Sequence, residues 1–132
     1  MKRMLGYLVV AVLASGLFGG CASLSTAKRF NGLDVTVEKT TPVEHLNAHV
    51  SGLYLLSIPL ITGDTKGGGL FLFHTDTATL DECVDYLTRR AKADGAAKAT
   101  DMVSRRTNQW LGPAGFFVLF WKSADVSANA IK

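Results

Sequence analysis

Three histidines and two cysteines are the residues of this chain best suited to bind a metal ion or act as nucleophiles. They are His45, His49, His74, Cys21 and Cys83. On a strand, the spacing of His45 and His49 places both side chains on one face but about 13 Å apart, too far to share one ion. Because a zinc site needs three or four converging ligands, we expect solvent-facing polar histidines. A metal site at His45, His49 and His74 is the alternative.

No serine or cysteine stands in a sequence context typical of a nucleophilic enzyme. Ser51-Gly52 lacks the leading glycine of the Gly-x-Ser-x-Gly motif. Counted from Gly63, the glycine-rich loop ends in Gly68-Gly69-Leu70, where a P-loop has glycine, lysine and then serine or threonine. The sequence therefore predicts a protein that is not an enzyme and has no cofactor, with a hydrolase as a further alternative.

The first 20 residues have the composition of an export signal. Lys2 and Arg3 precede an uncharged, mainly apolar run over residues 4–18, and Gly19-Gly20 follow it. This run is too short to span a bilayer permanently, since a spanning helix needs about 20 apolar residues. We therefore predict that residues 1–20 are a cleaved signal peptide.

The residues around Cys21 resemble the lipobox of bacterial lipoproteins. The stretch reads Leu17-Phe18-Gly19-Gly20-Cys21, with a small residue before the cysteine and Phe18 where the family usually has leucine. The resemblance implies that the Cys21 thiol receives a diacylglycerol and that the chain is cut before it. The freed amine would then be acylated, for example with palmitate, and two or more acyl chains hold a protein firmly at a membrane. Ala22, by the same resemblance, favours the outer membrane over the inner one.

The chain that remains after residue 20 is long enough for one small domain. Removing Lys2 and Arg3 leaves 12 of the 14 basic residues against 11 acidic ones, a balance of +1. This balance does not favour nucleic-acid binding, which requires a basic stripe. If Cys21 carries lipid, Cys83 has no disulfide partner, so we expect its thiol to be buried.

Small and polar residues dominate the segment after the signal peptide. Residues 21–32 predict a lipidated tether, and the folded domain is expected to cover residues 33–132. Alternation of apolar and polar residues over 33–38 predicts a strand. The next apolar stretch predicts either two strands, 44–50 and 53–58, or one long bent strand with a bulge at Gly52.

One helix is predicted over residues 80–94. Thr79 and Glu82 fit a capping box at its start, and Gly95 is a typical residue after its end. The apolar residues at helical spacing are Leu80, Cys83, Val84, Leu87 and Ala91. Cys83 therefore lies on the apolar face, where a buried thiol is expected.

Strands are predicted again after the helix. Residues 99–106 form one, and 126–130 form another or continue its neighbour. Residues 116–121 (Phe-Phe-Val-Leu-Phe-Trp) are apolar on both faces and predict a central strand covered on both sides. The order of strands, helix and strands predicts an α+β domain in which one main helix packs on a mainly antiparallel sheet.

The second half of the chain also resembles small envelope lipoproteins related to the Rcs stress-sensor lipoprotein. The resemblance rests on Ala93-Asp94-Gly95-Ala96 at the end of the helix and on Val126-Ser127-Ala128-Asn129-Ala130-Ile131 in the closing strand. It supports the α+β fold.

We therefore expect a lipid-anchored envelope protein whose domain faces the periplasm. It would bind or assemble with another envelope protein or with further copies of itself. The apolar segments at residues 70–73 and 116–121 are the expected contact surfaces. A periplasmic protein that binds a metal or a small ligand is the alternative.

Overall fold

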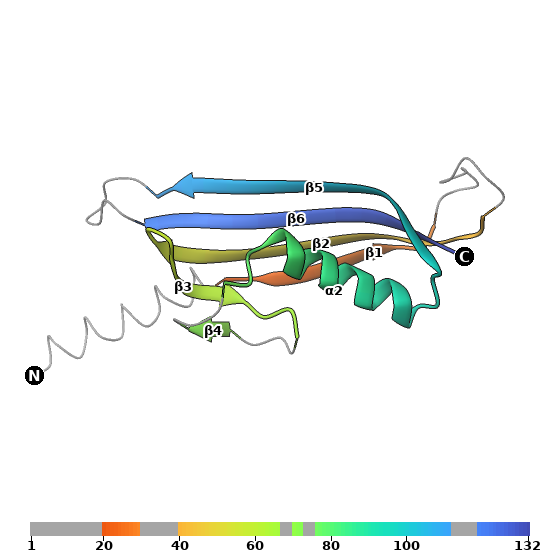
Figure 1. Cartoon of the computed structure of the whole chain (residues 1–132), viewed down its shortest axis with the longest axis horizontal. Helices are drawn as coiled ribbons and strands as arrows, with labels where there is room; N and C mark the ends of the chain where they lie inside the picture. Colours follow the sequence, from red (N-terminus) through yellow and green to blue (C-terminus); the bar gives the residue numbers. More distant parts are fainter. Residues whose placement is uncertain (1–19, 30–39, 67–69, 73–75, 112–118) are drawn as a thin grey trace, which may run out of the picture.

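The computed structural model describes residues 20–29, 40–66, 70–72, 76–111 and 119–132. Six strands and one helix lie within these ranges (Figure 1). In chain order they are β1 (Ala22–Ala27), β2 (Pro42–Leu55), β3 (Ile58–Gly63), β4 (Leu70–Leu72), α2 (Leu80–Ala93), β5 (Lys98–Trp110) and β6 (Leu119–Ile131).

The long strand β2 organises the sheet. It pairs with β6 on one side and, on the other side, with β1 over residues 45–50 and with β3 over residues 52–55. β1 and β3 therefore lie end to end along one edge of β2. The other strands follow the order β4-β3-β2-β6-β5, and every pairing is antiparallel. This confirms the predicted class, one main helix on an antiparallel sheet.

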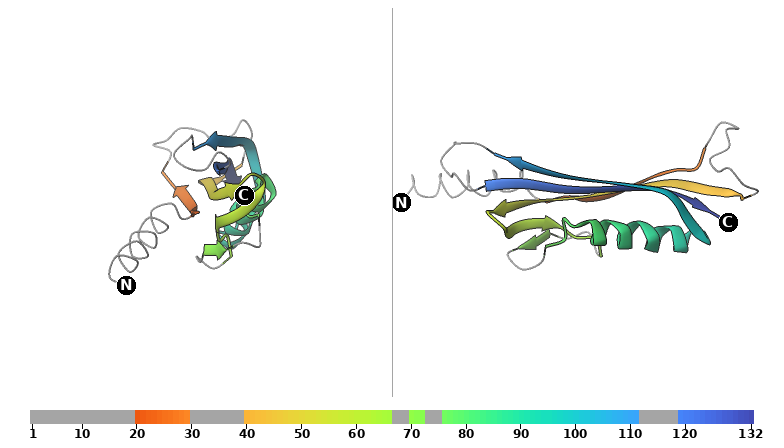
Figure 2. Two further views of the ribbon diagram at one scale, coloured as in Figure 1. Left: turned by 90° about the vertical axis from the view of Figure 1, so that its left-hand side faces the viewer. Right: turned by 45° about the horizontal axis from the view of Figure 1, so that its top comes forward.

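α2 packs across β2 and β6 and covers one face of the sheet (Figure 2). Alternate residues of both strands point toward the helix. The buried residues between the two layers are Leu46, Ala48 and Val50 of β2, Ala124, Val126 and Ala128 of β6, and Cys83, Leu87 and Ala91 of α2. The small alanine side chains of β6 leave room for the larger side chains of the helix at this crossing.

Local signals at both ends of α2 explain its bounds. The Thr79 hydroxyl accepts a hydrogen bond from the Glu82 amide at 3.3 Å, which confirms the predicted N-cap. Arg90 and Lys92 lie in the last turn, where they complement the helix dipole. Gly95 follows with a φ of +79°, a conformation that glycine adopts without strain.

β2 is one continuous strand, as the second of the two alternatives predicts. Its pairing with β6 is regular over residues 44–55, whereas its pairing with β3 shifts between Leu53 and Tyr54. The bulge therefore lies just beyond Gly52 and affects only the β3 side. Gly52 itself allows β3 to approach closely, because an added Cβ would lie 2.7 Å from the Thr62 side chain.

The predicted tether is wrong over residues 22–27, which form β1. Ala22 and Leu24 pack against the core, whereas Ser23 and Ser25 are exposed. Small polar residues are compatible with this strand because it lies at an edge and buries only two side chains. The strand predicted at residues 33–38 lies outside the described ranges.

The two strands after the helix differ in their surroundings. β5 extends to residue 110, beyond the predicted 106, and lies at the edge of the sheet, whereas β6 lies between β2 and β5. The prediction that residues 116–121 are covered on both faces is wrong for residues 119–121, the part that the structure describes. Leu119, Phe120 and Trp121 are only partly buried, and α2 lies on one face alone; residues 116–118 are not described.

Residues 70–72 form a short strand, β4, which pairs antiparallel with β3. In the part of the chain that the structure covers, no helix is both long and apolar enough to cross a bilayer.

Candidate functional site

The face of the sheet opposite α2, here called the open face, carries the two histidines that the structure describes. His45 and His49 alternate with buried residues of β2, so both side chains lie on this face, as the strand spacing predicts. Their partners across β6 are Asn129 and Asp125. Further polar residues of the same face are Asn47, Ser51, Ser123 and Ser127.

Each histidine is hydrogen-bonded to its own cross-strand partner. His49 Nδ1 lies 2.6 Å from Asp125 Oδ1, and His45 Nδ1 lies 2.7 Å from Asn129 Oδ1. The Asn129 amide nitrogen donates to Asp101 at 3.0 Å, so its oxygen accepts from His45. Both rings are thus held through Nδ1, and only Nε2 remains for a ligand.

The two histidines do not converge on one point. They belong to separate cross-strand pairs, with the Asn47–Ser127 pair between them. Among the residues with described positions, no group of three or more histidine, cysteine or acidic side chains is close enough to hold a metal ion. His74 lies outside those positions. The described part of the chain therefore offers no metal centre.

One arrangement on the open face has no counterpart in the sequence analysis. Ser23 of β1 lies directly opposite His49, which lies directly opposite Asp125, so the three stand in a row across three strands. A serine hydrolase needs a hydrogen bond from the serine hydroxyl to the imidazole, and none joins these two described residues. Only the strand register reveals this row, because its members are far apart in the sequence.

Cys21 is part of the sheet edge. Its carbonyl oxygen accepts a hydrogen bond from the Ser51 amide at 2.7 Å, and its own amide donates to the Ser51 hydroxyl at 3.3 Å. Its side chain is exposed. A thiol that carries lipid must be exposed, so this position is compatible with the predicted modification.

The chain is tightly packed where β1 begins beside the end of β3. An added Cβ on Gly20 would lie 2.5 Å from Thr62 Cα, and one on Gly63 would lie 2.4 Å from the Ala22 nitrogen. Gly20 is buried in this contact. Both positions therefore require glycine for the observed packing.

Cys83 is buried on the inner face of α2, as expected. Its thiol donates to the Ala124 carbonyl oxygen at 3.2 Å. Burial raises the pKa of the Cys83 thiol to about 11. Because the thiolate is the reactive form, this cysteine is a packing residue and not a nucleophile.

Glu44 is a buried acid among the apolar residues of β2. Its side chain is fully buried, and neither oxygen has a hydrogen-bond partner within the described ranges. Lys28 lies 3.8 Å from Glu44 and 3.6 Å from Asp94, and Arg90 lies 3.0 Å from Asp94. Burial is the main cause that raises the pKa of Glu44, and the neighbouring Asp94 carboxyl raises it further. The pKa of Asp94 is lowered by its contact with Glu44 and by the positive charges of Arg90 and Lys28. Lys28 thereby ties the end of β1 to the end of α2.

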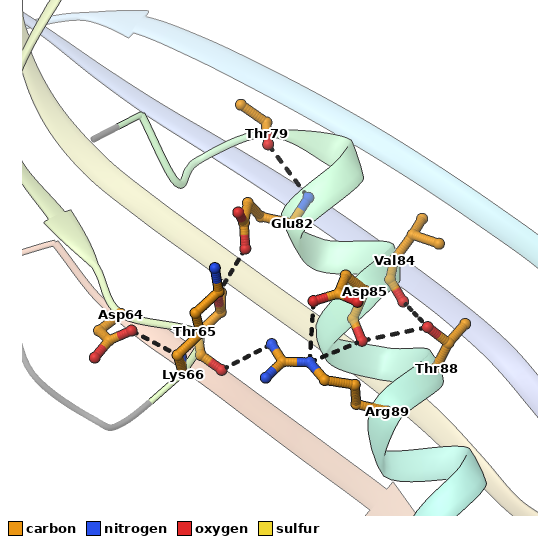
Figure 3. Close-up of polar contacts among 9 residues, drawn as sticks. All are labelled: Asp64, Thr65, Lys66, Thr79, Glu82, Val84, Asp85, Thr88 and Arg89. Carbon is orange, nitrogen blue, oxygen red and sulfur yellow. Dashed lines mark hydrogen bonds and ion pairs between the residues drawn. The ribbon is translucent and has the colours of Figure 1, made fainter.

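A second set of contacts joins the start of α2 to the turn after β3 (Figure 3). The Thr65 hydroxyl donates to Glu82 Oε2 at 2.9 Å, and Arg89 Nη2 donates to the Thr65 carbonyl oxygen at 3.2 Å. Arg89 also pairs with Asp85 at 3.0 Å. Glu82, Asp85 and Arg89 therefore stabilise the turn after β3, which accounts for their charges by a structural role.

A groove of about 330 Å³ lies between α2 and the start of β5. Its charged lining residues are Asp85, Arg89, Lys92 and Lys98, and the rest are Thr88 and small alanines. Arg89 is already paired with Asp85. The groove therefore presents two lysines and no aromatic or large aliphatic side chain, which is a poor match to the pockets that bind cofactors.

Comparison of the chain with protein-family models, with curated proteins and with solved structures finds no match. Its function must therefore be inferred from the residues and contacts described above.

Proposed function

We propose that this chain is a lipid-anchored lipoprotein of the bacterial envelope whose α+β domain is not an enzyme and binds another envelope component. The anchor is Cys21, the domain faces the periplasm, and the outer membrane is the expected location. β5 is the strand that binds the partner.

The exposure of β5 is the observation that carries this proposal. Twelve of its 13 residues are exposed, including large apolar ones: Met102 (44%), Val103 (65%) and Trp110 (52%). Within the described ranges it pairs with β6 alone, so its outer edge presents unpaired backbone groups. Proteins normally protect such an edge, because it readily accepts another strand. A partner strand added along β5 would complete the sheet.

The charges of β5 favour a partner different from the chain itself. Lys98, Arg105 and Arg106 stand against a single acid, Asp101. In an antiparallel pair of two copies centred on Ser104, the two Arg105 side chains would be diagonal neighbours on one face, within reach of each other, and their like charges would repel. An acidic segment of another protein fits better.

The states of the two cysteines support the anchor. Cys21 is exposed at the edge of the sheet, whereas Cys83 is buried and its thiol pKa is raised. An acyl chain on Cys21 would therefore meet no steric obstacle from the core. The metal-binding alternative has less support, because His45 and His49 are each held by a different partner.

Site-specific photo-crosslinking in cells tests the proposal. A photoreactive residue at Val103 should give an adduct with one distinct envelope protein, whereas the same residue at Asp81, exposed on α2, should not. Labelling with a radioactive fatty acid should be lost in Cys21→Ala. Equal crosslinking at both positions, an adduct with a second copy, or unchanged labelling would each contradict part of the proposal.

A further inference from the structure

The open face becomes apolar beyond Ser51 and Ser123. Two rows of three residues each cross β3, β2 and β6 in this region. The first row is Ile61, Leu53 and Trp121, and the second is Ile58, Leu55 and Leu119. These six residues are here called the apolar patch.

The apolar patch is not part of the core. Ile58 is 58% exposed, and the other five side chains are partly exposed. The residues that alternate with them, Tyr54 and Thr62, are fully buried on the opposite side of the sheet. Six large apolar side chains in one contiguous surface mark a place where a partner or a membrane is bound.

The apolar patch begins next to Cys21. Cys21 is hydrogen-bonded to Ser51, which lies two residues before Leu53 on the same face of β2. Two residues of a strand span about 7 Å. Because Ala22 and Leu24 point into the core, the alternation of β1 places Cys21 on the open face.

No flexible segment separates Cys21 from the sheet. Its backbone is held by Ser51 on both its amide and its carbonyl side, and β1 starts at the next residue. Acyl chains on Cys21 would therefore leave the domain beside Leu53 and Ile61. A second copy of the protein bound to the apolar patch would have to displace the acyl chains of Cys21, whereas a bilayer would accommodate these acyl chains.

We propose that the apolar patch lies on the lipid bilayer and that this end of the domain is held at the membrane at two points, the acylated Cys21 and this surface. The inference rests on the proposed lipidation of Cys21. Trp121, at the β6 end of the first row, is a suitable residue for this contact, because tryptophan concentrates at the interface between membrane and water. β5 continues the sheet beyond β6, so its outer edge remains free for a protein partner.

The two tryptophans of the chain offer a direct test because they lie on opposite faces. Trp121 belongs to the apolar patch, whereas Trp110 lies opposite Phe120, which packs against the core. Trp110→Phe leaves only Trp121 as a fluorophore, and Trp121→Phe leaves only Trp110. The full chain, purified from membranes, is reconstituted into vesicles of phosphatidylethanolamine and phosphatidylglycerol that contain brominated acyl chains. We expect several-fold stronger quenching, and a blue shift, for Trp121.

Equal quenching of the two tryptophans, or no quenching of Trp121, overturns the inference. A charged variant of the apolar patch, Ile58→Glu, should weaken the quenching of Trp121, whereas Ser104→Glu, which is exposed on the α2 side of β5, should not. A dimer in detergent that Ile58→Glu dissociates would assign the apolar patch to a second copy and would also overturn the inference.

Mass spectrometry of Cys21 in the same sample separates the two proposals. An acylated Cys21 with an unquenched Trp121 refutes the membrane contact and leaves the anchor intact. A bare thiol refutes the anchor; quenching of Trp121 in that sample would still support the contact, and its absence would refute both.

Discussion

Replacement of the buried acid Glu44 by glutamine should stabilise the protein at neutral and alkaline pH and have little effect in acid. Glu44 is fully buried, and burial raises its pKa. The folded state therefore retains a proton that the unfolded state has lost. Consequently the free energy of unfolding falls as the pH rises from about 4.5, the unfolded value, through the folded pKa. Glutamine has no charge to bury, so Glu44→Gln should remove this fall.

The size of the effect follows from the neighbours of Glu44. Lys28, at 3.8 Å, attracts its carboxylate by about 4 kcal/mol at an effective dielectric constant of 20. Lys28 is 56% exposed and shared with Asp94, which repels Glu44, so most of this attraction is lost. The desolvation of the charge is left largely uncompensated. Replacing a buried ion pair by neutral side chains of similar volume is often neutral or stabilising by roughly 1–4 kcal/mol, and for Glu44→Gln we expect about 2 kcal/mol at pH 8.

The free energy of unfolding contributed by Asp94 depends on pH in the opposite sense, so Asp94 provides a useful control. Its pKa is lowered in the fold, so its contribution is present above 3.8 and is lost as the pH falls through its folded pKa. Glu44 therefore changes the stability above about pH 4, and Asp94 changes it below about pH 4. At pH 8, Asp94→Asn should destabilise the protein.

Thermal unfolding of the detergent-solubilised protein, followed by circular dichroism from about pH 2 to pH 9, measures both effects. About 2 kcal/mol corresponds to roughly 10 °C in Tm for a domain of this size. A Glu44→Gln protein that is less stable than the wild type at pH 8 would show that Lys28 compensates the buried charge, and the reasoning would be refuted.

Three further substitutions or treatments test the packing of α2. Leu87→Ala should lower the free energy of unfolding by about 2–5 kcal/mol, because it empties a fully buried site, and a loss below 1 kcal/mol would contradict the core described above. Thr79→Ala should cost about 1 kcal/mol through loss of the N-cap, whereas Thr79→Ser should cost much less. Cys83 should resist alkylation at pH 8 in the folded protein and react in urea, measured by mass spectrometry; rapid reaction in the native state would exclude its burial.

The helix and its buried cysteine could be predicted because their signals are local. The cap at Thr79, the helical spacing of Cys83 and Leu87, and Gly95 all lie within one short stretch, and each acts on its immediate neighbours. The long strand β2 was predictable as one of two alternatives, since only tertiary pairing decides whether Gly52 interrupts a strand.

The edge strands were harder to predict because burial did not shape their sequences. β1 buries only two small or medium side chains, so its composition is that of a linker. β5 is exposed on both faces, and therefore its second half carries no alternation of apolar and polar residues. The partners of His45 and His49 depend on the register between β2 and β6, whose members are 76 or more positions apart in the chain.

The burial of Gly20 bears on the timing of maturation. In the folded chain the bond between Gly20 and Cys21 is packed against Thr62 and Gly63, where no peptidase could hold it in an extended form. If the chain is cut there, the cut has to come before β3 folds onto β2. Export, trimming and closure of the sheet would then be consecutive events, and a chain that closed too early would keep its leader.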